Sequence, residues 1–251
     1  MNATLNAHAQ ADGPATTPTR AKVPIWDAPV RAMHWLAVLS FAGAWLTAEA
    51  DGWRAVHISF GFSLAGVMAL RVLWGLVGSR HARFASFVRG PRAVLAHFRG
   101  LAAGDAEPHS GHNPAGGWAV LALIGLSLAV GLSGWLTYTQ GEAFEDVHEL
   151  VAEGLLALVG LHVAAVVLMS WLSQQNLVRA MVGGRKVAPA ADANPRPHRG
   201  LGALVLVAVL AFWAWGMGPA TPFTGGMDGE RAESQERGEH GDRARRDHDD
   251  D

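Results

Sequence analysis

Residues 115–136 of this 251-residue chain read AGGWAVLALIGLSLAVGLSGWL and contain no charged side chain. A second stretch of the same kind, LGALVLVAVLAFWAWGMGP, occupies residues 201–219. A helix needs about 20 apolar residues to cross the hydrocarbon core of a bilayer. A helix on the surface of a soluble protein would instead show polar residues on its outer face. These two stretches therefore predict membrane-spanning helices.

Five apolar segments alternate along the chain with connections that contain Gly, Pro and charged residues. The segments cover about residues 32–48, 56–77, 115–138, 147–172 and 201–217. Their lengths predict five transmembrane helices, so the expected fold class is an all-α integral membrane protein. The polar N-terminus lacks the short apolar core of a cleaved signal peptide, and the first segment is therefore expected to be a true span.

Basic side chains are concentrated in the second and fourth connections, whereas acidic ones predominate in the first and third. The basic residues are Arg80, Arg83, Arg89, Arg92 and Arg99 in the second connection and Arg179, Arg185, Lys186, Arg196 and Arg199 in the fourth. Short loops rich in Arg and Lys stay in the cytoplasm. The pattern predicts a multi-pass protein of the bacterial cytoplasmic (inner) membrane, with a cytoplasmic N-terminus and a periplasmic C-terminal tail.

The chain has no cysteine and 12 histidines. The lack of cysteine excludes disulfides, iron–sulfur clusters, thiolate zinc sites and covalently attached c-type haem. Histidine is therefore the main candidate ligand for a metal centre. The formal net charge of −2 gives no indication of a nucleic-acid partner. The sequence also shows no nucleotide-binding motif, no activated nucleophile and no pair of catalytic carboxylates.

Four histidines, His34, His57, His148 and His162, lie within or at the ends of predicted spans. An ionisable side chain inside a membrane is costly and usually functional, although any one of them could be an interfacial or helix-capping residue. His148 and His162 face the same side of one predicted helix, about 21 Å apart along its axis. His57 and His148 lie near the outer ends of their spans, whereas His34 and His162 lie deeper, toward the inner side. The matched depths predict two sites, each with two histidines from different helices.

Two imidazoles from different helices suit a haem iron, because the porphyrin supplies its other four ligands. Zinc would need three or four protein ligands, and copper would usually recruit Met or a third His. Small residues near the histidines would leave room for a flat cofactor, although each also suits close helix packing. They are Gly61, Gly66, Gly131, Gly134, Gly154 and Gly160.

Several motifs resemble those of the bacterial cytochrome b561 family, which includes the b-type cytochrome subunit of nickel–iron hydrogenases. The motifs are VPIWDAPVRAMHW at residues 23–35, RVLWGLVGSRHARF at residues 71–84, GHNPAGGW at residues 111–118, His148-Glu149, and Leu161-His162-Val163. The resemblance covers about residues 23–187. It implies a four-helix transmembrane bundle that holds two non-covalent b haems, with the four matching histidines as axial ligands.

The domain organisation expected from the resemblance has four parts. Residues 23–187 would form the di-haem membrane domain, and residues 188–219 a linker and a fifth, C-terminal transmembrane helix, which departs from the family's four-helix core. Residues 1–22 and the charged tail at residues 220–251 are expected to be disordered, because so few apolar residues cannot form a core.

Polar residues close to the histidines are secondary candidates. Arg71 lies near the inner end of the second predicted span and could pair with a haem propionate, or could extend to the inner lipid headgroups. Glu149 and Glu153 could orient ligands, relay protons or mark a solvated helix end. Four histidines of the connections are interpreted as loop residues: His81, His97, His109 and His112.

The leading hypothesis for function is electron transfer across the membrane through two bis-histidine b haems. The chain would connect the quinone/quinol pool with a partner redox protein of a respiratory chain, such as a dehydrogenase, a hydrogenase or a c-type cytochrome. It would contact membrane lipid, and quinone is a candidate further ligand. This interpretation favours an electron-carrying cytochrome subunit over a self-sufficient enzyme. The rival hypotheses are a stand-alone quinol oxidase-type enzyme that uses a small oxidant, and a metal transporter without haem.

Overall fold

The computed structural model of the chain describes residues 20–50, 52–104, 110–218, 221 and 223. Its long helices are α1 (Ala28–Leu46), α2 (Arg54–Val77), α5 (Pro114–Gln140), α6 (Glu145–Leu172) and α8 (Arg199–Gly216). Each coincides with one of the five predicted apolar segments, to within a few residues at either end. The predicted disorder of the two chain ends falls almost wholly outside the described residues.

Four of the described helices are long and apolar enough to cross a membrane, by length and composition: α2, α5, α6 and α8. Helix α1 has 19 residues, carries Arg31 and His34 near its start, and is not among these four. The fold is therefore that of a multi-pass helical membrane protein, as the sequence predicts. A span by α1, and with it the five-span topology, stays a prediction.

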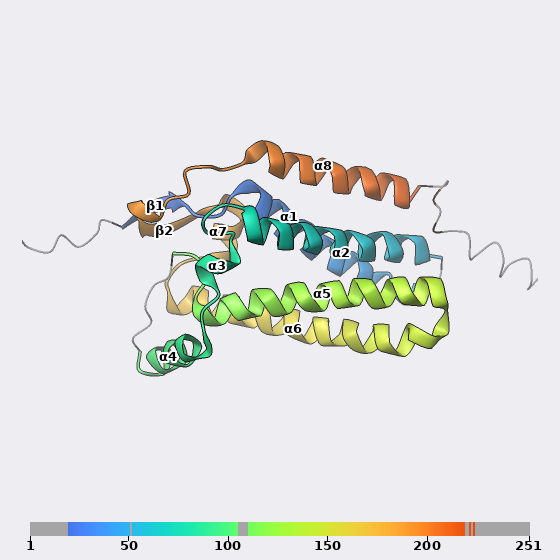
Figure 1. Cartoon of the computed structure of the whole chain (residues 1–251), viewed down its shortest axis with the longest axis horizontal. Coiled ribbons are helices and arrows are strands. Elements are labelled where there is room, and N and C mark those ends of the chain that lie inside the picture. Colours follow the sequence, from blue (N-terminus) through green and yellow to red (C-terminus); the bar gives the residue numbers. More distant parts are fainter. Residues whose placement is uncertain (1–19, 51, 105–109, 219–220, 222, 224–251) are drawn as a thin grey trace, which may run out of the picture.

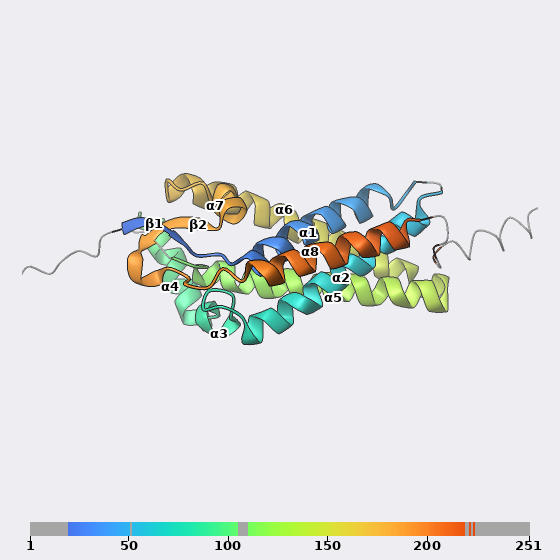
Figure 2. The same cartoon turned by 90° about the horizontal axis from the view of Figure 1, so that it is seen from above.

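The long helices lie side by side in three layers (Figures 1 and 2). Helix α8 forms one outer layer, α1 and α2 form the middle layer, and α5 and α6 form the other outer layer. A common core joins all of them. Its buried residues are Met33, Leu36, Leu64, Val67, Met68, Ile124, Leu155, Val205 and Val209.

Helix α8 packs closely on the middle layer because small residues and one hydrogen bond bring the backbones together. A Cβ placed on Gly202 would come within 2.8 Å of Ala28, and a Cβ on Gly216 within 2.6 Å of the Ser59 hydroxyl. The indole Nε1 of Trp213 donates to the Ser63 Oγ at 2.7 Å. Glycine at such contacts is how helices in a membrane approach each other, so α8 is an integral part of the bundle.

A two-stranded antiparallel sheet at one end of the bundle was not expected from the sequence. Strand β1 (Arg20–Pro24) pairs with β2 (Arg185–Pro189), so Arg20 lies opposite Pro189 and Pro24 opposite Arg185. Strand β1 begins inside the predicted N-terminal extension, and β2 crosses the predicted boundary at residue 187. Both strands are only five residues long, and their pairing depends on residues more than 160 positions apart, which no local pattern can predict.

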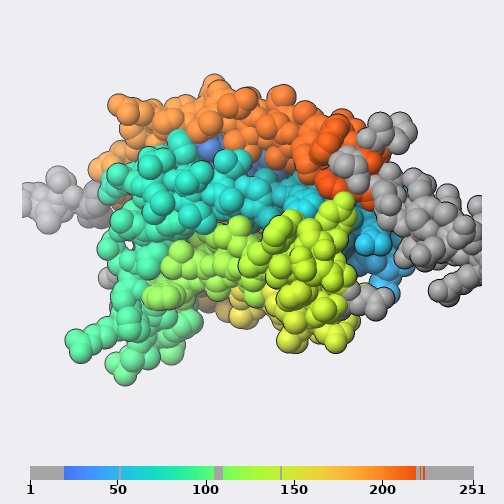
Figure 3. Space-filling model, turned by 45° about the vertical axis from the view of Figure 1, so that its right-hand side comes forward, coloured from blue at the N-terminus to red at the C-terminus, as the bar shows by residue number. Residues whose placement is uncertain are grey.

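The connections at the sheet end of the bundle contain further short helices. They are α3 (Phe84–Phe87), α4 (Pro91–Ala102) and α7 (Leu177–Gly183), with a 3₁₀ turn at Ala190–Asp192. Another 3₁₀ turn, Glu142–Phe144, joins α5 to α6 at the opposite end. Helix α4 projects from the body of the molecule beside α5 (Figures 1 and 3). The Arg-rich second connection thus contains two short helices, α3 and α4.

Candidate functional site

The outer pair of predicted ligands, His57 and His148, is brought together by α2 and α6. Their ring centroids are 6.2 Å apart, with the ring planes at 86°. His57 lies in the first turn of α2 and His148 in the first turn of α6. Helix α2 runs antiparallel to α1, and α6 runs antiparallel to α5. The first turns of α2 and α6 therefore both lie at the end of the bundle away from the sheet.

Each histidine of the outer pair is held through its Nδ1 atom. The Nδ1 of His57 lies 2.9 Å from the backbone carbonyl oxygen of Ala44, and the Nδ1 of His148 lies 3.0 Å from the Ser133 Oγ. A carbonyl only accepts, so His57 donates its Nδ1 proton and keeps a lone pair on Nε2. Hydrogen bonds of this kind orient histidines that bind a metal through the other ring nitrogen.

The inner pair, His34 of α1 and His162 of α6, is close enough for the charge of one imidazole to act on the other. The Nδ1 of His34 is buried and has no hydrogen-bond partner among the described residues. The Trp35 ring packs edge-on against His34, with centroids 5.1 Å apart. The structure thus brings the predicted outer pair into ring contact and places the predicted inner pair within electrostatic range.

Arg71 lies near the C-terminal end of α2 and turns into the protein. Its side chain is only 7% exposed, its Nη1 has no hydrogen-bond partner in the described part of the chain, and its Cζ lies 5.2 Å from the centroid of the Phe84 ring. The Asp27 carboxylate acts on it electrostatically. This inward position differs from the predicted alternative in which Arg71 extends to the lipid headgroups.

Asp27 was not singled out as a functional residue from the sequence, yet it organises this region. Its Oδ1 accepts from the backbone N–H of Val30 at 2.9 Å and so caps the start of α1. Its Oδ2 accepts from the indole Nε1 of Trp74 at 2.9 Å, which ties α1 to α2. The side chain is 2% exposed. The sequence signal was the Asp-Ala-Pro at residues 27–29, a common start of a helix.

His112 is a loop residue, as predicted, but it is built into the protein. Its ring packs against Trp26 and Phe87, with centroid distances of 4.7 and 4.6 Å. Its Nδ1 is buried without a hydrogen-bond partner among the described residues. Burial and, to a smaller extent, the positive charges of Arg71 and Lys186 together lower the pKa of His112 from 6.5 to about 3. His112 is therefore a neutral imidazole at physiological pH.

The lowered pKa of His112 predicts a specific loss of stability in acid. An unfolded histidine binds a proton below about pH 6.5, whereas the folded His112 does not until about pH 3. The unfolded state therefore binds more protons between these values, and stability falls as the pH falls through that window. Acidification from pH 6.5 to pH 5 should cost at most about 2 kcal/mol, at 1.36 kcal/mol per unit.

The replacement His112→Gln removes the titrating group and should reduce this acid sensitivity. We expect the drop in Tm between pH 7 and pH 5 to be smaller in the variant than in the original protein, measured by thermal unfolding in detergent. The other histidines are common to both proteins and cancel in the comparison. Equal drops in Tm would show that His112 is not held neutral by the fold.

The glycines near the histidines have different surroundings. A Cβ on Gly134 would lie 3.0 Å from the His148 ring, and a Cβ on Gly131 would lie 2.5 Å from the Ala65 Cβ of α2. Gly134 therefore makes room for the ligand candidate, whereas Gly131 serves the contact of α5 with α2. A Cβ on Gly61 or Gly160 would meet no atom of the described residues within 4 Å. Helix α6 makes its main helix contacts with α5.

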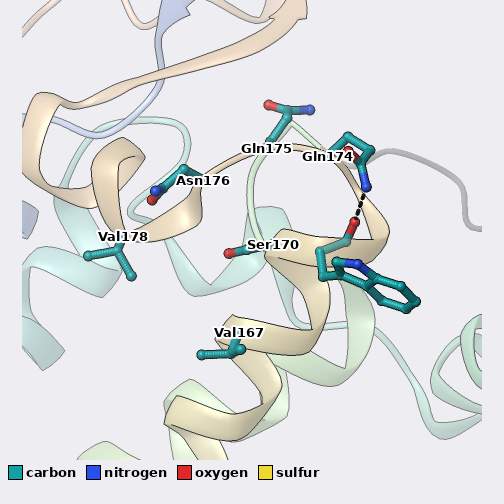
Figure 4. Close-up of a pocket in the computed structure, with 7 residues that line it drawn as sticks. Val167, Ser170, Gln174, Gln175, Asn176 and Val178 are labelled. Carbon is teal, nitrogen blue, oxygen red and sulfur yellow. Dashed lines mark hydrogen bonds between the residues drawn. The ribbon is translucent and has the colours of Figure 1, made fainter.

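Two hollows in the structure involve other residues. A pocket of about 470 Å³ lies where α6 passes into α7 and is lined by Val167, Ser170, Trp171, Gln174, Gln175, Asn176 and Val178 (Figure 4). A second, of about 240 Å³, lies beside His112 and includes Arg80, His81, Ser110 and Asp192. Neither is lined by the four paired histidines. Within the described residues, no three His, Cys, Asp or Glu side chains gather as a metal site.

Comparison with known proteins gives a consistent result. The family described as prokaryotic cytochrome b561 matches residues 25–184. A probable Ni/Fe-hydrogenase B-type cytochrome subunit of Bradyrhizobium diazoefficiens is 25% identical, with 66% of this chain and 87% of that protein covered. The protein of the same description from Azotobacter vinelandii is 30% identical, with 69% and 92% covered. That from Rhodobacter capsulatus is 22% identical, with 66% and 82% covered.

No solved structure matches this chain. The family match nevertheless extends over more than half of the chain and includes the helices that carry the four paired histidines. The resemblance noted in the sequence is thereby confirmed. This chain belongs to the prokaryotic cytochrome b561 family, whose members are multi-pass membrane proteins that transfer electrons with b-type haem.

Proposed function

We propose that this chain carries electrons from one face of the membrane to the other through two b haems, one held by His57 and His148 and the other by His34 and His162. The observation that carries the proposal is the pairing of four histidines from three helices at two levels of one bundle. Haem, when bound, supplies an iron that gains and loses one electron. The protein's part is to hold the two groups at different depths.

The geometry of the outer pair supports its role as an axial pair. Metal–imidazole bonds are about 2 Å long, so an iron between two imidazoles would hold the ring centroids about 6 Å apart. The centroids of His57 and His148 are 6.2 Å apart. The hydrogen bonds at Nδ1 leave the two Nε2 atoms free, and these atoms would hold the iron of a bound haem.

Unpartnered polar atoms support a polar ligand at the inner level. Buried polar groups are normally hydrogen-bonded, but His34 Nδ1, Arg71 Nη1 and His112 Nδ1 have no partner among the described residues. Haem carries two propionates, and a carboxylate is the usual partner of a buried guanidinium. We propose that Arg71 pairs with a propionate of the inner haem, with His112 nearby.

This role of Arg71 can be tested through the reduction potential of the inner haem. A positive charge beside a haem favours the reduced state, so Arg71→Met should lower the inner midpoint potential by an amount on the order of tens of millivolts. Arg71→Lys should lower it less, and Arg92→Met, on α4, should leave it unchanged. Spectroscopic redox titration gives both potentials. An unchanged inner potential in an Arg71→Met protein that retains both haems would contradict the assignment.

We propose a partner redox protein that exchanges electrons with this chain, and the names of the relatives point to a nickel–iron hydrogenase. Quinone is the proposed partner at the other end of the path, because it is the mobile electron carrier dissolved in the bilayer. This chain matches most of the length of each of these relatives, which supports the proposal that it is the same type of subunit. Affinity purification of this chain with its bound proteins would test the partner, and it should recover a hydrogenase. If no hydrogenase is recovered, the partner would be a different dehydrogenase or a c-type cytochrome.

The proposed orientation in the bacterial inner membrane follows the basic connections. The Arg-rich segments around α4 and α7 lie at the sheet end of the bundle, which is the proposed cytoplasmic end together with the N-terminus. With α1 as a span, the C-terminal tail is periplasmic. A phosphatase reporter that is active only in the periplasm should therefore be active when fused after Met227 and inactive when inserted after Gly104. The reverse result would invert the topology.

The visible spectrum of the purified protein tests the central proposal. We expect a red protein with sharp α-bands on reduction and two haems per chain in a haem assay. One haem per chain would rule out the second site, and a colourless protein would rule out both. Steady-state oxidation of quinol with a small oxidant by the purified chain would instead favour a stand-alone enzyme.

A further inference from the structure

Helix α4, Pro91–Ala102, has an apolar face that the rest of the protein does not cover. It contains no buried residue. Leu95 and Phe98 are 51% and 55% exposed. At about 100° per residue, Val94, Leu95, Phe98 and Leu101 share one side of the helix, about 120° wide. An apolar stripe of that width on an exposed helix requires another apolar surface to cover it.

Two arginines border this apolar stripe. Arg92 and Arg99 are seven residues apart, so they project in nearly the same direction, next to Leu95. Both are exposed. The whole stretch from residue 78 to residue 104 contains five arginines and no Asp or Glu. Every charged side chain of this stretch other than histidine is therefore positive, and an apolar strip lies alongside.

The position of α4 relative to the spans fixes its depth. The indole Nε1 of Trp118, in the first turns of α5, donates to the carbonyl oxygen of Arg89 at 2.8 Å. A Cβ on Gly117 would come within 2.9 Å of the Phe87 carbonyl oxygen. The segment that leads into α4 is thus attached at the end of a candidate span, next to a Trp, and Trp is enriched at the level of the lipid headgroups. Figures 1 and 3 show α4 beside this end of α5, outside the long helices.

We propose that α4 is an interfacial helix that binds the acidic phospholipids of the protein's own membrane. Leu95 and Phe98 enter the boundary between headgroups and acyl chains, and Arg92 and Arg99 contact the phosphates. Helices with an apolar face bordered by basic residues lie in this way on membranes with acidic lipids. A protein partner fits less well, because a stable interface needs about 800 Å² from each side, and two half-exposed side chains supply only part of that. This proposal does not depend on how the chain holds haem.

The lack of cysteine in the chain makes a direct test simple. Single replacements Leu95→Cys, Phe98→Cys and Ala96→Cys each accept a spin label, and Ala96 lies on the opposite side of α4. The full-length haem-containing protein is reconstituted in vesicles of phosphatidylcholine and of equimolar phosphatidylcholine and phosphatidylglycerol. Collision of the label with oxygen reports the lipid phase, and collision with a water-soluble nickel chelate reports water.

With phosphatidylglycerol present, the labels at positions 95 and 98 should be reached by oxygen and protected from the nickel chelate, and the label at position 96 should behave in the opposite way. Each basic residue near an acidic membrane surface is worth about fivefold in affinity. With phosphatidylglycerol present, the double variant Arg92→Gln/Arg99→Gln should therefore lower the ratio of membrane-bound to unbound α4 by about 25-fold. The control variant Arg179→Gln/Arg196→Gln, which removes two exposed arginines elsewhere at this end, should not lower it.

Two results would overturn the proposal. One is exposure of positions 95 and 98 to the nickel chelate in both kinds of vesicle, which would leave the apolar face to a protein partner. The other is protection that is equal with and without phosphatidylglycerol, or that the double variant does not weaken. In that case α4 would rest on the membrane without selecting acidic lipid.

Discussion

Replacement of His57 or of His148 by alanine is expected to halve the haem content of the purified protein, from two haems per chain to one. The reason is that an iron between two imidazoles is held by both, and the proposed pair lies with its ring centroids 6.2 Å apart. After the loss of one ligand, a single imidazole would hold the non-covalent haem at an end of the bundle that is exposed to detergent, and this haem would be lost during purification. The remaining haem should keep its low-spin spectrum, because the inner pair is untouched.

The double variant His57→Ala/His148→Ala gives the sharper result. If the two histidines share one iron, removal of both should cost no more haem than removal of either, and the same spectral component should disappear in all three proteins. Control variants at His81 and His97, which the pairing does not involve, should retain both haems. If the double variant loses both haems, or if either single variant retains two with unchanged spectra, the pairing is wrong.

Ser133 offers a graded version of this experiment. Its hydroxyl lies 3.0 Å from the Nδ1 of His148, and partners of this kind orient a ligating histidine and typically change metal affinity 10- to 100-fold. Ser133→Ala should therefore weaken retention of the outer haem without removing its ligand. Comparison of Ser133→Ala with His148→Ala therefore distinguishes a residue that orients the ligand from the residue that binds the haem iron.

The long helices and the outer histidine pair could be predicted from the sequence because both depend on local regularities. A charge-free run of 20 residues is a sufficient signal for a span, and the 14-residue separation of His148 and His162 fixes their relative direction on any α-helix. The depth of each histidine in the membrane then follows from the number of residues between it and the end of its helix. The predicted and observed helix boundaries agree to within a few residues because helix starts also carry a local signal. Asp27 and Asn113 cap α1 and α5 with side chains that favour this position.

The features that could not be predicted depend on contacts between distant parts of the chain. Strands β1 and β2 pair across more than 160 residues, and Asn194 N–H donates to the carbonyl oxygen of Pro24 at 2.7 Å within the same assembly. The burial of His112 depends on Trp26 and Phe87, which belong to other segments. Its own neighbours, Gly111 and Asn113, indicate only a turn. Arg71 was equally ambiguous, because its inward direction is decided by Asp27 and Phe84 and not by its place in the span.

Replacement of His34 or of His162 by alanine is expected to stop electron flow between the two faces of the membrane while the outer site stays reducible. The two levels are separated by 14 residues of α6, or about 21 Å. Without the inner pair, an electron at the outer level would have to cross the remaining apolar thickness in one step. We therefore expect the rate across the membrane to fall by orders of magnitude, although half of the haem remains.

Vesicles that contain the purified protein, with ferricyanide trapped inside and an impermeant reductant added outside, measure this rate directly. Mixed orientation does not disturb the comparison, because passage in either direction requires both levels. His81→Ala should conduct as the original protein does. A variant at His34 or His162 that has lost one haem and still reduces the trapped ferricyanide at the original rate would show that the two levels are not steps of one path, and the histidine pairs would then serve separate functions on the two sides.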